Sequence, residues 1–165
     1  MTSASGAPQA LSVDLDQLEG ASLLLLPVTH QGAAGLYPEW ETGLARQLRE
    51  AGVTVAWATK NRAYVHNFSA EVDAVLQVAL LLVEPITQAA VAAIVGYLRG
   101  LVSPESKAPT EVEIHYATEV DLSTGKVSDF SVLTVPTDAP VDVVALVREF
   151  NSGRVAVIKA AQDRG

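Results

Sequence analysis

Four consecutive leucines, Leu23 to Leu26, constrain the fold of this 165-residue chain more than any other feature. They lie inside the short apolar run from Ala21 to Val28. Successive side chains of a strand point to opposite faces, so an unbroken apolar run of this length is typical of a strand buried on both faces. The sequence therefore predicts a central strand here.

A helix and a second strand are expected to follow. Pro38 suits a first helical turn, and Gly52 marks the end of the helix. Between them lies an apolar stripe formed by Trp40, Leu44, Ala45 and Leu48. Val53 to Ala58 is rich in strand-forming residues. Residues 21 to 58 thus predict a β-α-β unit with a parallel pair of strands, followed by a polar loop from Thr59 to Ser69.

The middle of the chain predicts a strand and an alanine-rich helix. Ser69 suits the start of one short helical turn, which runs into a buried strand at Leu80 to Val83. Pro85 cannot continue a central ladder, and Ile86 to Leu101 has the alanines of a closely packed helix. Ser103 to Pro109 is typical of a linker.

From Glu111 onward the hydropathy alternates with a period of two, which predicts a strand with one solvated face. Ser123-Thr124-Gly125 supplies a turn, and Val127 to Val135 supplies the second strand of an antiparallel hairpin. Pro140 to Phe150 is expected to form a closing helix. Its inward side chains are expected to be Val143, Val144 and Val147.

The elements together predict one α/β domain. A mixed sheet would contain the β-α-β unit and the hairpin, packed against the alanine-rich and closing helices. The expected limits are a flexible leader over 1–19, the domain over 20–153, and a tail over 154–165 that either adds an edge strand at Val155 to Ile158 or stays loose. The predicted core residues are Leu24, Leu26, Val55, Leu80, Leu82, Ile94 and Leu98.

Charge and cysteine usage exclude several classes of function. The chain has 11 basic and 19 acidic residues, a net charge of -8, so neither nucleic acid nor an anionic membrane is an expected partner. It has no cysteine, which excludes disulfides, thiolate nucleophiles and Cys-ligated metals. Polar residues and Pro85 interrupt the most apolar stretch, 74–102, so no membrane span is expected. We expect a cytoplasmic protein.

Motifs for catalysis and cofactor binding are missing. Gly125-Lys126 lacks the residues of a phosphate loop, and Gly32-Ala33-Ala34-Gly35 is not a dinucleotide fingerprint but a flexible crossover loop. His30, His66 and His115 lie far apart without metal-type spacing. The sequence therefore predicts no cofactor and no metal, and it favours a non-catalytic protein.

One alternative is a crevice at the carboxyl ends of the strands, where ligands of parallel sheets bind. His30, Arg62 and Glu84 stand at expected strand ends. A base, a cation and a carboxylate would suit a small hydrolase or a site for an anionic ligand. The simpler interpretation is that charged residues flank buried strands because the chain meets water there.

The order of elements resembles the effector-associated constant component of bacterial NTP-dependent conflict (immunity) systems. The resemblance lies in the helix ending Leu44 to Glu50, the strand Leu80 to Val83, the helix ending Tyr97-Leu98-Arg99, the hairpin with Ser123 to Lys126, and the final helix Val143 to Phe150. It implies a non-catalytic adaptor or regulator of an effector protein, with antiviral defence as the setting.

The hairpin carries the candidate partner-binding residues. If Asp121 pairs with Lys126, one sheet face holds Glu111, Glu113, Glu119, Phe130 and Val132. Such a face suits a protein partner with a basic surface. A one-residue register shift, or cover from the tail near Ile158, would instead bury Phe130 and leave a solvated acidic surface. The sequence leaves a homo-oligomer open.

Overall fold

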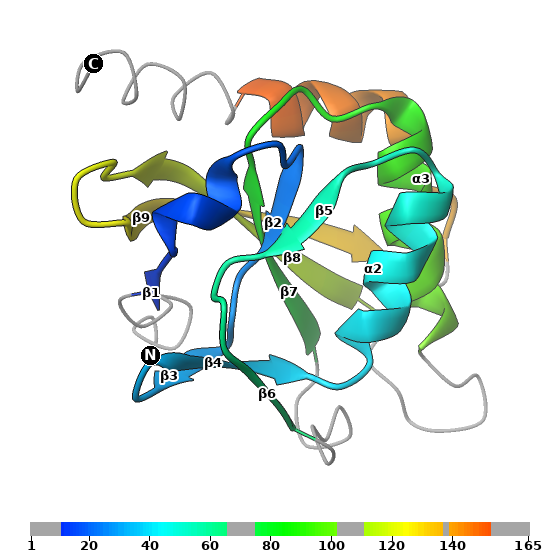
Figure 1. Cartoon of the computed structure of the whole chain (residues 1–165). Helices are drawn as coiled ribbons and strands as arrows, with labels where there is room; N and C mark the ends of the chain where they lie inside the picture. Colours follow the sequence, from blue (N-terminus) through cyan, green and yellow to red (C-terminus); the bar gives the residue numbers. More distant parts are fainter. Residues whose placement is uncertain (1–10, 66–74, 102–110, 137–138, 153–165) are drawn as a thin grey trace.

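The computed structural model describes residues 11–65, 75–101, 111–136 and 139–152, and its largest element is a mixed six-stranded sheet (Figure 1). The strands, in spatial order, are β1 (Leu11–Ser12), β9 (Lys126–Pro136), β8 (Glu111–Val120), β7 (Val75–Leu82), β2 (Leu23–Leu25) and β5 (Val55–Trp57). The pairs β7–β8 and β2–β5 are parallel, and the other neighbours are antiparallel. The predicted α/β class is confirmed.

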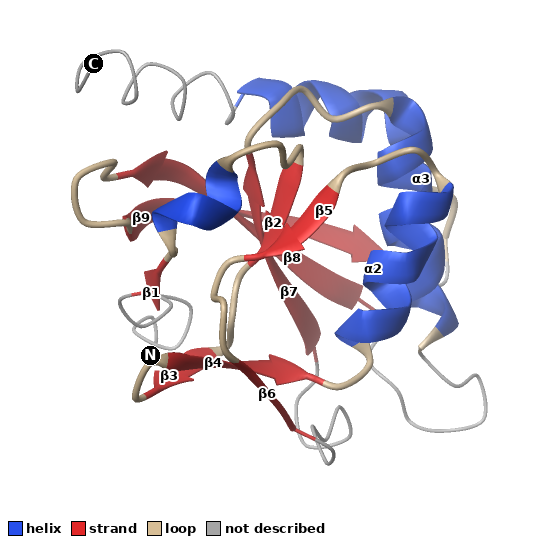
Figure 2. Cartoon of the chain, in the orientation of Figure 1, coloured by secondary structure: helices blue, strands red, loops and turns tan. Residues whose placement is uncertain are grey.

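A second sheet and three longer helices complete the described fold. The second sheet contains β3 (Thr29–Gln31), β4 (Ala34–Pro38) and β6 (Arg62–Val65). The helices are α2 (Glu41–Glu50), α3 (Gln88–Gly100) and a closing helix over 143–152, which with the short 3-10 helix η1 (Leu15–Leu18) are the blue ribbons of Figure 2.

The predicted β-α-β unit is present, with α2 connecting the parallel strands β2 and β5. Gly52 ends α2 with φ +90°, a backbone conformation that side chains with a Cβ rarely adopt. Gly43 lies where α2 approaches α3, and a Cβ there would collide with the Tyr97 hydroxyl. That hydroxyl donates to the Trp40 carbonyl at 2.8 Å, so a glycine inside the helix permits the contact between the two helices.

Two apolar cores lie on opposite faces of the six-stranded sheet. Leu23 and Leu25 join the larger core with α2, α3 and the closing helix, whereas Leu24 and Leu26 join the smaller core with Leu81. The leucine run is continuous because both faces are covered. All the predicted core residues are buried, namely Leu24, Leu26, Val55, Leu80, Leu82, Ile94 and Leu98.

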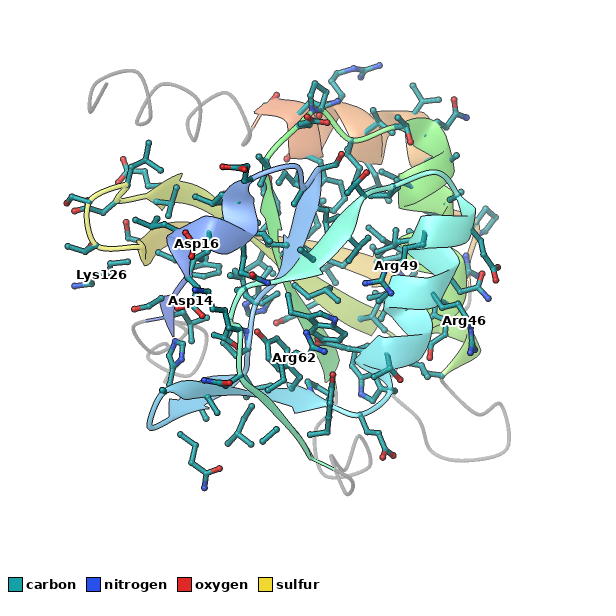
Figure 3. The ribbon with its side chains drawn as sticks, viewed as in Figure 1. Asp14, Asp16, Arg46, Arg49, Arg62 and Lys126 are labelled. Atoms are coloured by element: carbon teal, nitrogen blue, oxygen red, sulfur yellow. The ribbon has the colours of Figure 1, made fainter. Side chains whose placement is uncertain are left out.

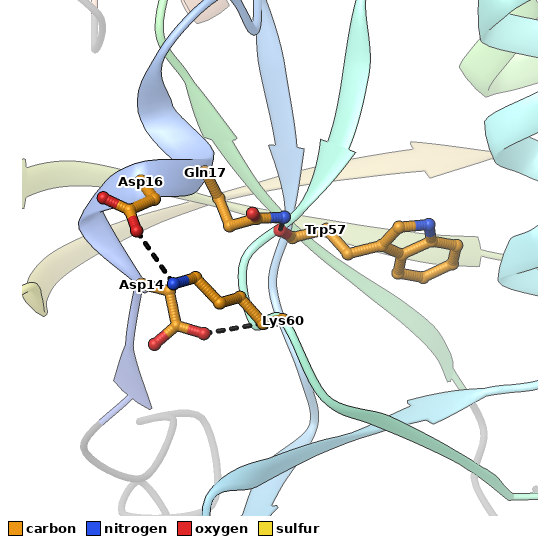
Figure 4. Close-up of polar contacts among 5 residues, drawn as sticks. All are labelled: Asp14, Asp16, Gln17, Trp57 and Lys60. Atoms are coloured by element: carbon orange, nitrogen blue, oxygen red, sulfur yellow. Dashed lines mark hydrogen bonds and ion pairs between the residues drawn. The ribbon is translucent and has the colours of Figure 1, made fainter.

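The N-terminal segment covers part of the smaller core, so the prediction of a flexible leader over 1–19 is wrong from Leu11 onward. Leu11 and Val13 are 1% and 3% exposed. The segment is also bonded to the connection after β5 (Figure 4). Asp14 Oδ2 accepts from the Lys60 backbone N–H at 2.6 Å, and the Lys60 ammonium lies 2.8 Å from Asp16 Oδ2. Alternating apolar residues at Leu11 and Val13 were a signal for this strand.

The second sheet lies in segments that the sequence predicted otherwise. Pro38 ends β4 rather than entering a helix, and the expected flexible loop at Gly32 is a hairpin turn between β3 and β4. Arg62–Val65, expected as loop, is β6, and it pairs in parallel with β4. These strands are short and lack an alternating pattern, so nothing in their local sequence outweighed the turn signals.

The closing helix begins at residue 143, and only part of its predicted apolar face is right. Val143 and Val147 pack against the larger core, and Phe150 is fully buried. Val144 is 53% exposed, so its predicted inward position is wrong. The spacing 143, 147, 150 follows one helical face, and residue 144 lies about 100° away from residue 143 around the axis.

Of the two hairpin registers that the sequence left open, the structure has the one in which Asp121 pairs with Lys126. The Asp121 N–H donates to the Lys126 carbonyl at 2.8 Å, and the partners Ala117↔Phe130 and His115↔Val132 follow from this turn. Five predictions lie wholly or partly outside the described residues: the leader over 1–10, the short turn at Ser69, His66, the linker over 103–109, and the tail over 154–165.

Candidate functional site

The register of the hairpin places acidic and apolar residues at positions on one side of the sheet, which we call the β8–β9 face. Its members are Glu111, Glu113, His115, Ala117, Glu119, Ser128, Phe130, Val132 and Thr134. Val132 is 46% exposed and Glu119 is exposed, whereas Phe130 is half-buried against the smaller core. The face therefore has an apolar part that continues into the core and a carboxylate at its solvated side.

A histidine–carboxylate pair lies within this face. His115 is 5% exposed, and its Nε2 lies 2.9 Å from Glu113 Oε1. The two residues are two apart on β8, so the period of the strand brings them to the same side. The sequence interpretation treated His115 as an ordinary strand residue, although this spacing was the available signal for the pair.

The charge of the hairpin region is strongly asymmetric. Residues 111–142 contain seven acids, Glu111, Glu113, Glu119, Asp121, Asp129, Asp138 and Asp142, and one base, Lys126. Seven minus one leaves -6 of the chain's -8. Arg46 and Arg49 lie on α2, at the other side of the view from Lys126 (Figure 3). The hairpin region therefore carries most of the net negative charge of the sequence.

Two of the three crevice candidates lie in the second sheet. His30 and Arg62 both pair with Gly35, one from β3 and one from β6, so they are two strands apart. His30 Nε2 accepts from the Ser12 backbone N–H at 2.9 Å. Arg62 stacks over Trp57 at 5.1 Å and donates to the Tyr64 hydroxyl at 2.9 Å. Each side chain has a structural partner.

Glu84 lies at the other end of β2, so the structure does not bring the three crevice candidates together. Because β7 runs antiparallel to β2, its carboxyl end lies beside the start of β2. There Ser22 Oγ donates to Glu84 Oε1 at 2.9 Å. A crevice shared by His30, Arg62 and Glu84 required a parallel β7, and no local sequence signal distinguishes the two directions.

A pocket of about 230 Å³ opens beside Glu84. It lies between the end of α2 and the start of α3, and its wall combines apolar side chains with the polar groups of Ser22, Glu84 and Thr87. The lining residues are Ser22, Leu23, Ala51, Gly52, Val53, Leu82, Glu84, Pro85, Ile86, Thr87 and Ala90. Glu84 is the only charged residue among them.

Glu41 is a buried acid at the start of α2, and nothing in its sequence context singles it out. It is 1% exposed, and its Oε1 has no hydrogen-bond partner among the residues that the structure describes. Burial raises the pKa of Glu41 well above its ordinary value, since the charged form is poorly solvated there. Tyr37 is nearby, and burial raises the pKa of this tyrosine too.

Neither the geometry of the described residues nor comparison with known proteins assigns this chain to a class of protein. Within residues 11–65, 75–101, 111–136 and 139–152, no group of three or more histidines and acids is arranged to hold a metal ion. No helix in this part of the chain is long and apolar enough to cross a membrane. No family model, curated protein or solved structure matches the chain.

Proposed function

We propose that this domain is a non-catalytic protein-interaction module that binds a partner with a basic surface through the β8–β9 face. One observation carries the proposal: the register puts Phe130 and Val132 on the same face as Glu113 and Glu119. Apolar side chains at the centre of an interface contribute affinity, and charges at its rim accelerate association with a partner of opposite sign. Phe130 packs partly on the smaller core, and Val132, which is 46% exposed, is the apolar side chain that a partner would cover.

The resemblance to components of bacterial conflict systems suggests what the partner is. An adaptor of that kind would bind an effector protein, and the β8–β9 face would be the surface that the effector contacts. The local charge of -6 over residues 111–142 favours an effector with clustered lysines or arginines at the contact.

Site-specific photo-crosslinking in cells of the source organism tests the proposal. A photoreactive phenylalanine analogue replaces Val132, which is 46% exposed on the β8–β9 face. The control places it at Val144, which is 53% exposed on the closing helix and is also a valine. We expect one dominant adduct from position 132, containing a second protein with a basic surface, and none from position 144.

Three outcomes would contradict the proposal. The first is an absence of adduct at position 132, and the second is the same adduct at both positions. The third is an adduct with twice the mass of this chain, because a second copy would bring another acidic hairpin to the face. The crosslinked peptide, identified by mass spectrometry, distinguishes the third outcome from a basic partner.

A further inference from the structure

We propose that the pocket beside Glu84 binds a small protonated primary amine with an apolar substituent. The pocket lies at the carboxyl end of β7, whereas Glu111 pairs with Val75 at the start of that strand. None of the residues that line the pocket belongs to the β8–β9 face. Its volume of about 230 Å³ is below the usual range for drug-sized ligands, which points to a ligand of a few carbon atoms.

The polar groups of the pocket favour an ammonium group. A carboxylate offers about four lone-pair positions, and the Ser22 hydroxyl occupies one position on Glu84 Oε1. The remaining positions on Glu84 and the lone pairs of Ser22 Oγ can accept from the N–H groups of one ammonium. These acceptors converge because Val83 and Glu84 both donate their backbone N–H groups to the Ser22 carbonyl, at 2.9 and 3.1 Å.

The helix ends nearby reinforce this preference. The pocket is lined by Ala51 and Gly52, where α2 ends with a partial negative charge of about half an electron. The start of α3 carries an opposite partial charge of similar size, and there Thr87 Oγ1 already accepts from the Ala90 N–H at 3.1 Å. The two partial charges offset each other, so the full charge of Glu84 decides the sign of the site.

The apolar side chains of the wall would contact the substituent of the amine. Leu23, Leu82 and Ile86 are buried side chains of this wall, 1%, 1% and 7% exposed. Asn151 of the closing helix fixes Ile86, accepting from its N–H at 2.9 Å and donating to its carbonyl at 3.3 Å. The wall is therefore held in place before a ligand arrives, which lowers the entropy cost of binding.

The probe for this site is n-butylammonium, titrated into the 15N-labelled protein and followed by amide chemical shifts. We expect saturable shifts at Gly52, Val53 and Ala90, with a dissociation constant in the millimolar range because Glu84 is exposed. Butan-1-ol, which has the same shape without the charge, should bind at least tenfold more weakly, and butyrate should not bind.

Two variants separate recognition by Glu84 from general attraction to an acidic protein. Glu84→Gln keeps an oxygen for Ser22 and should weaken n-butylammonium binding at least tenfold. Glu50→Gln removes the same charge from an exposed residue of α2 outside the pocket and should leave binding within twofold of the wild type. Non-saturating shifts, equal binding of butan-1-ol, or unchanged binding by Glu84→Gln would each overturn the proposal. A failure of n-butylammonium to bind would leave the proposal for the β8–β9 face unaffected, because the crosslinking experiment tests that proposal independently.

Discussion

The two faces of the six-stranded sheet are covered in different ways. α2, α3 and the closing helix cover one face, and the larger core there includes Phe150 and Ile94. The smaller core on the other face takes its cover from the short N-terminal segment with Leu11 and Val13. The β8–β9 face continues from this second side, with Phe130 at the margin of the smaller core. We therefore expect stability to depend mainly on the helical side, and the other side is where side chains of the β8–β9 face reach solvent.

The largest expected effect compares neighbouring leucines of β7. Leu82 joins the larger core and Leu81 the smaller core, and they are 1% and 0% exposed. Leu82→Ala should cost about 2–5 kcal/mol in the free energy of unfolding, the usual range for a buried leucine. Leu81→Ala should lower the free energy of unfolding by about 2 kcal/mol, because the N-terminal segment that covers the smaller core can relax into the cavity. Chemical denaturation measures both, and a larger loss at Leu81 would reverse our comparison.

The contact between the hairpin turn and the N-terminal segment gives the next prediction. Gly125 has φ +79°, and a Cβ there would collide with the Val13 carbonyl oxygen. Gly125→Ala should therefore destabilise the protein by about 1–3 kcal/mol and increase hydrogen exchange at the Val13 amide, which donates to Gly125 at 2.8 Å.

Gly96 supplies the matched control. It lies inside α3, and beyond the helix's own backbone and the two chain neighbours no atom of the described residues lies within 4 Å of an added Cβ. Gly96→Ala should stabilise the protein by about 0.5–1 kcal/mol through helix propensity. If both glycine variants behaved alike, the N-terminal segment would not depend on the turn as described.

Glu41 on the helical side gives a pH-dependent effect. Its pKa in the folded state is raised, so the folded protein keeps the proton at pH values where the unfolded chain has lost it. The free energy of unfolding should then decrease as the pH rises from about 4.5 toward the raised pKa. Glu41→Gln has no proton to lose, so it should remove this decrease and be more stable than wild type at pH 8. Parallel profiles for the two proteins over pH 4 to 8 would contradict the burial of the Glu41 carboxyl group.

The sequence predicted elements whose pattern follows from their own burial. Leu23 to Leu26 predicted a strand covered on both sides, and the alternation from Glu111 onward predicted β8 with its inward Val112, Ile114 and Tyr116. For these elements, local sequence and tertiary structure give the same answer. The hairpin register was left open by the sequence, and the pairing of Asp121 with Lys126 decides it. His115 and Ala117 of the expected solvated face are buried because the smaller core extends under that face.

Features set by distant contacts were missed. The direction of β7 is decided by its neighbours β2 and β8, so the separation of Glu84 from His30 was not visible in the sequence. Arg62–Val65 is a strand only because β4 lies beside it. The pocket beside Glu84 combines three stretches of chain, 22–23, 51–53 and 82–90, and no motif joins them.

The most direct test of the central claim measures how fast the crosslinked partner associates with variants of the β8–β9 face. Glu111→Lys and Glu119→Lys are combined, and Glu113 is kept because it contacts the buried His115. Glu50→Lys with Glu149→Lys is the control, since it makes the same change of charge on exposed residues of the helices.

We expect the hairpin variant to associate with the purified partner at least tenfold more slowly than wild type at low ionic strength, and to lose most of the salt dependence of the rate. The control variant should stay within about twofold of wild type, because its charges lie outside the interface. Equal rates and equal salt dependence for wild type and the hairpin variant would contradict the assignment of the β8–β9 face as the docking surface.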